Sequence, residues 1–81
     1  MKQRVILFAR ARELAGNDHV EIEIPDSARV GDVRRELLAQ TPALRSLAGN
    51  LLIAVNNSYA SDELAVVPGA EIACFPPVSG G

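Results

Sequence analysis

The run from Val20 to Ile24 alternates strictly between apolar residues and glutamates. Because successive side chains of a β-strand point to opposite faces, this alternation predicts a strand with one face in a core and the other in water. Pro25 follows at once and ends the strand. The chain is therefore expected to contain a sheet with one wet face.

One segment carries the apolar spacing of a helix that could cover the other face. Its apolar positions are Val30, Val33, Leu37 and Leu38. This spacing predicts an amphipathic helix over residues 31–40. Thr41 and Pro42 end that helix, and a second short helical turn is expected over residues 43–47.

Four further segments read as strands. They are residues 3–9, 51–55 and 71–75, with a weaker extended piece at 59–60. A short turn or a helical cap over residues 14–17, ending in Gly16-Asn17, should join the first two strands as a hairpin, and Pro68-Gly69 has the order of a type II turn. Together these elements predict one α+β domain, in which a single main helix covers a mixed sheet of about five strands.

Composition narrows the class of protein. Eighty-one residues support one domain with a modest core, and a net charge of −2 argues against a nucleic-acid binder. The single cysteine excludes an internal disulfide, the sequence offers no Cys/His set for a metal, and no apolar segment approaches a membrane span. A cytoplasmic protein is expected. Four cations near the start, Lys2, Arg4, Arg10 and Arg12, fit either solvated charges or a small patch for a partner.

The sequence contains no recognisable catalytic or phosphate-binding motif. His19 is expected at the surface, and the adjacent Asp62 and Glu63 lack the spacing of an acid/base pair. Cys74 lies in an apolar strand with no neighbouring cation in sequence, so it should behave as a small hydrophobic residue. Phe75, next along that strand, is either a core residue or an exposed anchor for a partner.

The segment Pro76-Pro77-Val78-Ser79-Gly80-Gly81 is the most informative feature for function. The prolines favour an extended backbone, and the two glycines have no side chain, so another protein could bind the segment closely. The chain is thus expected to divide into a domain over residues 1–75 and a flexible tail over 76–81. The carboxylate of Gly81 is a poor electrophile and would need activation by another protein, most simply by adenylation.

These residues resemble a known family, the small sulfur-carrying subunits of molybdopterin synthase, which are ubiquitin-like β-grasp proteins. The resemblance rests on the run from Phe8 to Gly16, on Val55-Asn56, and on Gly69 to Gly81 with its terminal Phe-Pro-Pro-Val-Ser-Gly-Gly. Ala70 and Cys74 depart from the family's usual acidic and larger apolar residues at these positions.

The resemblance implies a role in making molybdenum cofactor. Gly81 would be adenylated by an ATP-using enzyme, converted to a thiocarboxylate and inserted into the large synthase subunit, where sulfur passes to cyclic pyranopterin monophosphate. Gly80, Ser79, Val78, Pro77 and Pro76 would be bound as the tail, with Phe75 and Arg12 contacting the partner. No cofactor would be bound by this chain, the catalytic lysines would belong to the large subunit, and the complex would be a heterotetramer.

Other functions remain open from the sequence. A sulfur carrier for thiamine shares the diglycine but usually lacks the Phe-Pro-Pro-Val lead. A ubiquitin-like modifier would form isopeptide links to lysines, and a plain interaction module would leave the tail idle. The sequence does not identify the sulfur donor.

Overall fold

The computed structural model describes residues 1–76. Its elements are β1 (Lys2–Leu7), α1 (Ala9–Ala15), β2 (His19–Glu23), α2 (Val30–Gln40), the 3₁₀ helix η1 (Pro42–Leu47), β3 (Leu52–Val55), β4 (Ser58–Tyr59) and β5 (Ile72–Phe75). The strands form one sheet in the order β2-β1-β5-β3-β4. The central β1 and β5 are parallel, and the other neighbours are antiparallel. The predicted mixed sheet of five strands is confirmed.

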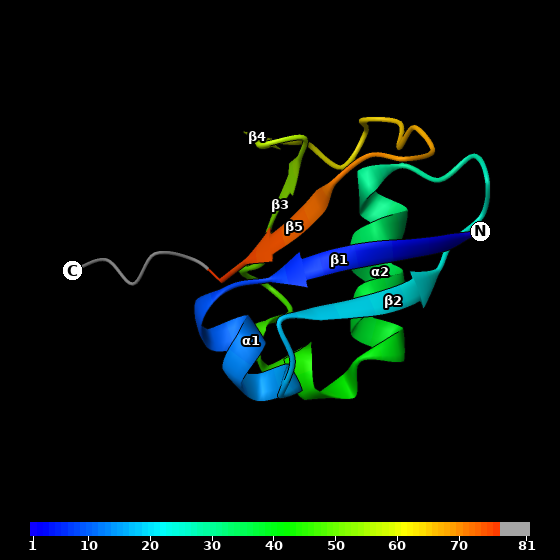
Figure 1. Ribbon diagram of the computed structural model, residues 1–81. Coiled ribbons are helices and arrows are strands. Elements are labelled where there is room, and N and C mark those ends of the chain that lie inside the picture. Colours follow the sequence, from blue (N-terminus) through cyan, green and yellow to red (C-terminus); the bar gives the residue numbers. More distant parts are fainter. Residues whose placement is uncertain (77–81) are drawn as a thin grey trace.

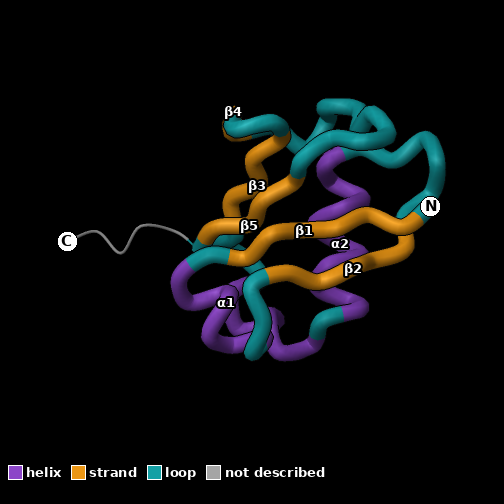
Figure 2. The backbone as a smooth tube through the Cα atoms, viewed as in Figure 1, coloured by secondary structure: helices purple, strands orange, loops and turns teal. Residues whose placement is uncertain are grey.

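The helix α2 packs across one face of this sheet (Figure 1). The tube in Figure 2 shows the same layering, with β1 and β2 crossing in front of α2. Burial alternates along β1, where Val5 and Leu7 are enclosed and Arg4 is exposed. The core joins the inward side chains of the sheet to Val30, Val33, Leu37 and Leu44. No helix within residues 1–76 is long and apolar enough to cross a membrane.

Of the two alternatives expected between β1 and β2, a short turn or a helical cap, the structure has the cap, but it ends a longer helix than the sequence suggested. The first strand ends at Leu7, and the helix α1 fills Ala9–Ala15. Alanine, arginine, glutamate and leucine are among the best helix formers, which explains the helix. Gly16 ends it with a left-handed φ of 75°, and its N–H donates to the carbonyl of Arg12 at 3.0 Å. The two strands are still antiparallel neighbours, but a helix joins them instead of a tight turn.

The loop before β5 is tied to the start of α2. The N–H of Gly31 donates to the Asp62 carbonyl at 2.9 Å, and the Asp62 carboxylate pairs with Arg34 at 3.2 Å. The sequence predicts Asp62 to be a solvated loop charge, whereas in the structure it holds this loop to the start of α2. The predicted type II turn is confirmed, because Gly69 has a φ of 87° and Ala70 donates to the carbonyl of Val67 at 3.0 Å.

Candidate functional site: the open face of the sheet

The sheet face opposite α2 carries an apolar surface at the end where β5 finishes. Side chains on this face come from alternate positions of each strand. Strand register sets Ala73 beside both Ile6 and Ala54, and it sets Phe75 beside Leu52. We call this surface the aromatic patch; its members are Ile6, Phe8, Leu52, Ala54, Tyr59, Ala73 and Phe75.

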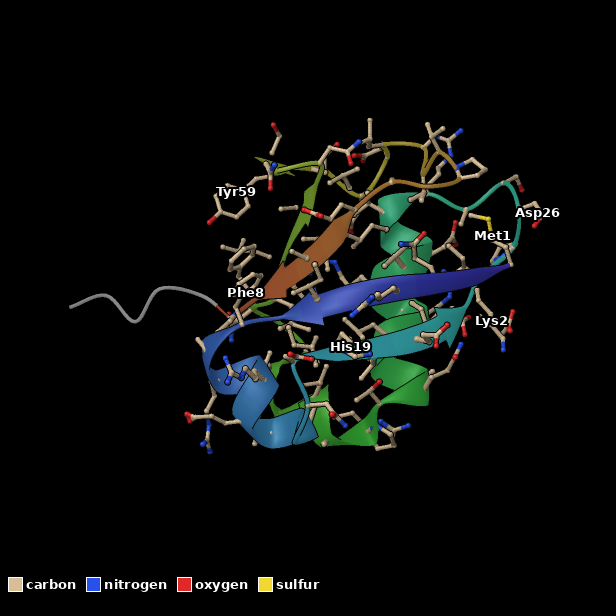
Figure 3. All side chains as sticks on the ribbon, viewed as in Figure 1. Met1, Lys2, Phe8, His19, Asp26 and Tyr59 are labelled. Carbon is tan, nitrogen blue, oxygen red and sulfur yellow. The ribbon has the colours of Figure 1, made fainter. Side chains whose placement is uncertain are left out.

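Three aromatic rings form the centre of the patch. Phe8 and Phe75 are stacked with centroids 4.7 Å apart and planes 3° from parallel. Tyr59 meets Phe75 edge-on at 6.0 Å. Phe8 and Tyr59 lie on the same side of the sheet, near the end of β5 (Figure 3). Because such rings combine large apolar area with a rigid shape, they are suited to anchoring a protein partner.

The patch is both exposed and hollowed. Phe8 is 42% exposed, Leu52 39% and Tyr59 70%. Between the rings and β5 lies a hollow of about 240 Å³, bounded on its polar side by Asn57 and Glu71. Large exposed apolar side chains with a polar rim mark interaction sites on small soluble domains.

Phe75 lies on this open face and outside the core. Its strand neighbours Ile72 and Cys74 point the other way and are enclosed, whereas Phe75 is half-buried by the other rings. This placement supports the anchor interpretation over the core interpretation. Its contact with a partner stays a prediction.

The predicted tail lies largely beyond the structure. Pro76, half-buried directly after β5, is described. The predicted tail residues Pro77, Val78, Ser79, Gly80 and Gly81 lie outside the described residues. What the structure provides is the position of the last strand residue, which is itself a member of the aromatic patch.

The other residues considered from sequence fall in different places. Arg12 is exposed on α1, at the margin of the open face. His19 is a surface residue whose Nδ1 lies 2.8 Å from the Asp18 carboxylate, and this hydrogen bond is the main reason why the pKa of Asp18 is lowered. Cys74 is enclosed in the core, where desolvation raises the pKa of its thiol to about 11.

Sequence reasoning gave no site role to Phe8, Leu52 or Tyr59. Strand alternation could have found Phe8, because it continues the outward positions Arg4 and Ile6 one residue beyond the end of β1. Leu52 and Tyr59 come from short strands whose register the sequence does not specify. Within residues 1–76 no three His, Cys, Asp or Glu side chains gather where they could hold a metal ion.

Comparison with known proteins gives a consistent picture. A family model described as the ThiS family matches residues 5–81. The molybdopterin synthase sulfur carrier subunit of Haemophilus influenzae is 44% identical over 80 residues, covering 95% of this chain and 96% of that one. The corresponding subunit of Chlamydomonas reinhardtii is 36% identical, with complete coverage of both chains. The solved structure of SAMP1 from Haloferax volcanii is 34% identical and covers both chains fully with a TM-score of 0.84.

Proposed function

Because the chain belongs to the ThiS family, we propose that it is the sulfur carrier subunit of a molybdopterin synthase and acts in molybdenum cofactor biosynthesis. The carboxylate of Gly81 attacks ATP on an activating enzyme, and pyrophosphate leaves. A sulfur nucleophile then displaces AMP and leaves a thiocarboxylate at Gly81. That sulfur passes to cyclic pyranopterin monophosphate on the large synthase subunit.

One observation of the structure carries this proposal. The aromatic patch includes Phe75, the last residue of β5, and the segment Pro76–Gly81 follows it directly. A partner that docks on the patch therefore meets the start of the segment that bears the reactive group. Two steps need such docking: activation by the ATP-using enzyme and delivery to the large subunit.

The chain's own residues support a carrier role. Its one thiol is enclosed with a raised pKa, so it is a poor nucleophile. Sulfur is therefore carried at the C-terminal carbonyl. In this proposal the catalytic lysines belong to the large subunit, ATP is used by the activating enzyme, and the assembly is a heterotetramer in the cytoplasm.

The relatives support a role in molybdenum cofactor biosynthesis. The sulfur carrier subunits of Haemophilus influenzae and Chlamydomonas reinhardtii align with this chain along at least 95% of its length. Gly80 and Gly81 also lie inside the span that the family model matches.

The deciding experiment is intact-mass analysis of the full chain after incubation with the activating enzyme, ATP and a sulfur donor. The expected product has one oxygen replaced by sulfur at the C-terminus. A variant lacking Gly81 should keep the thermal unfolding profile of the full chain, because the buried core is formed by residues between Val5 and Cys74, yet gain no sulfur. Precursor conversion by the large subunit should also require Gly81. Sulfur transfer by the truncated chain would contradict the proposal.

A second function is favoured by one comparison. SAMP1 of Haloferax volcanii is a small archaeal modifier protein, and its fold and sequence match this chain along their whole lengths. A modifier would join Gly81 to lysine amines of other proteins after the same adenylation. Lysine adducts that end in the diglycine, found by mass spectrometry of cell extracts, would support this role. Their absence, in cells whose molybdopterin synthesis depends on the chain, would leave sulfur transfer as its function.

A further inference from the structure

A second hollow lies on the open face beside the aromatic patch, between β1, the start of β2 and α1. Its volume is about 340 Å³, and its walls include Arg4, Ile6, Phe8, Arg12, Asp18 and His19. Ile6 and Phe8 line both hollows, so the two are adjacent and share a wall. We call this one the cationic hollow.

The hydrogen bonding of His19 decides what Arg4 can do. A carboxylate only accepts hydrogen bonds at neutral pH, so the 2.8 Å contact between Asp18 and His19 requires the proton on Nδ1. Nη2 of Arg4 lies 3.5 Å from the same Nδ1. Because that nitrogen already carries a proton directed at Asp18, it cannot accept from Arg4. The Arg4 guanidinium is therefore left without a side-chain acceptor among residues 1–76.

The nearby carboxylates form no ion pair with these cations within residues 1–76, although the pKa of Asp18, lowered mainly by the His19 hydrogen bond, is lowered further by the charge of Arg12. Glu21 is the register partner of Arg4 on β2, but neither Arg4 nor Arg12 takes part in the ion pairs found within residues 1–76. Asp18 lies in the hollow and is engaged with His19. Two guanidinium groups thus face a hollow that holds one carboxylate, and an anionic group is the complement that the hollow lacks.

We propose that the cationic hollow receives a carboxylate side chain of the protein that docks on the aromatic patch, with Arg4 as its principal donor. The inference rests on the proposed function for the identity of that protein, the large synthase subunit. The wall that the hollow shares with the patch places the carboxylate at the edge of the same interface. Apolar contact then supplies affinity, and the ion pair fixes the orientation of the partner.

The test is calorimetric titration of the full chain with its cognate large subunit. Arg4→Gln removes one charge and the donor fork and should weaken binding about tenfold or more. Lys2→Gln is the matched control, because Lys2 is exposed on the same face of the same strand but outside the hollow. The control should change the dissociation constant by no more than about twofold, as expected for an exposed charge. Far-UV circular dichroism should show both variants folded, because both side chains are exposed.

Two further readouts separate an ion pair from a structural effect. Raising salt from about 0.1 M to about 1 M shortens the Debye length from about 10 Å to about 3 Å. Binding of the wild type should weaken with salt more steeply than binding of Arg4→Gln. Asp18→Asn, which removes the competing carboxylate, should bind more tightly than the wild type.

The titration distinguishes failure of this inference from failure of the proposed function. If the wild type binds the large subunit and Arg4→Gln behaves like Lys2→Gln, the cationic hollow has no role in docking. If the wild type does not bind the large subunit at all, the proposed function fails in its choice of partner, and this inference fails with it.

Discussion

Replacing Phe75 by alanine tests the central feature of the site, the stacked pair of Phe8 and Phe75. Two interpretations of Phe75 predict different costs in the isolated protein. A fully buried phenylalanine loses about 3–5 kcal/mol on truncation to alanine. Phe75 is half-buried on the open face, with Phe8 stacked on it at 4.7 Å and Tyr59 edge-on at 6.0 Å. Each such aromatic pair is worth about 0.5–1.5 kcal/mol beyond the area that it buries.

We therefore expect Phe75→Ala to reduce the free energy of unfolding by about 2 kcal/mol. About 1 kcal/mol of this should be coupling to Phe8, measurable in a double-mutant cycle with Phe8→Ala. A domain of this length is stable by roughly 4–12 kcal/mol, so the variant should still fold. Urea unfolding followed by far-UV circular dichroism gives these free energies directly.

The same variant should also bind its partner more weakly, and this loss of affinity should appear in the folded protein. If Phe75 is an anchor, Phe75→Ala should weaken binding to the large subunit by about 2 kcal/mol or more, which is about 30-fold. Val67→Ala is the control, since Val67 is 67% exposed in the loop before β5 and is not part of the patch. A stability loss of about 4 kcal/mol with unchanged affinity of the folded fraction would show that Phe75 is a core residue and would refute this reasoning.

Two further predictions concern the body of the domain. Burial raises the pKa of Cys74 from 9.0 to about 11. As the pH rises, the thiol therefore loses its proton in the unfolded chain before it does so in the folded one. About 2–3 kcal/mol of the free energy of unfolding, present below pH 9, should be lost as the pH rises from 9 to 11. Urea titrations across that range should show this loss in the wild type and not in Cys74→Ala; equal pH dependence of the two would contradict it. Gly69→Ala should cost about 1–2 kcal/mol in urea unfolding, because φ is 87° with nothing within 4 Å of the added Cβ. Gly49→Ala, where the space is equally open and φ is not positive, should be close to neutral, and equal costs at the two sites would exclude backbone strain.

Most of the fold could be predicted because its signals are local. The alternation in β2, the helical spacing of α2 and the Pro68-Gly69 turn each appear within a few residues of sequence. The helix α1 was missed although its composition favours a helix. The apolar run through Leu7 and Phe8 predicts a longer strand, whereas β1 ends at Leu7. Phe8 then precedes α1 and is exposed on the open face. An apolar side chain at this position predicts strand and core, but in the structure it forms part of an exposed surface.

The site was less predictable because it depends on register. Phe75 lies 67 positions from Phe8 in sequence, and the parallel pairing of β1 with β5 brings them together. Tyr59 joins them through β4 and β3, which are short strands with weak sequence patterns. In the family resemblance Phe8 is only one residue of the run from Phe8 to Gly16. Its contact with Phe75 is a tertiary fact that no local pattern contains.

The arrangement of the open face separates what folding needs from what binding needs. Where the start of β1 pairs with β2, the open face carries the charged residues Lys2, Glu21 and Glu23. The fold therefore does not require the whole open face to be apolar. Aromatic rings appear only at the other end, beside the start of the tail. Stacking hides one face of Phe8 and of Phe75 from water, which limits the exposed apolar area of the free protein while keeping a rigid surface for a partner. Folding alone would favour burying these three aromatic side chains, whereas a carrier whose reactive group must be presented to successive partners needs them exposed around the last residue of β5.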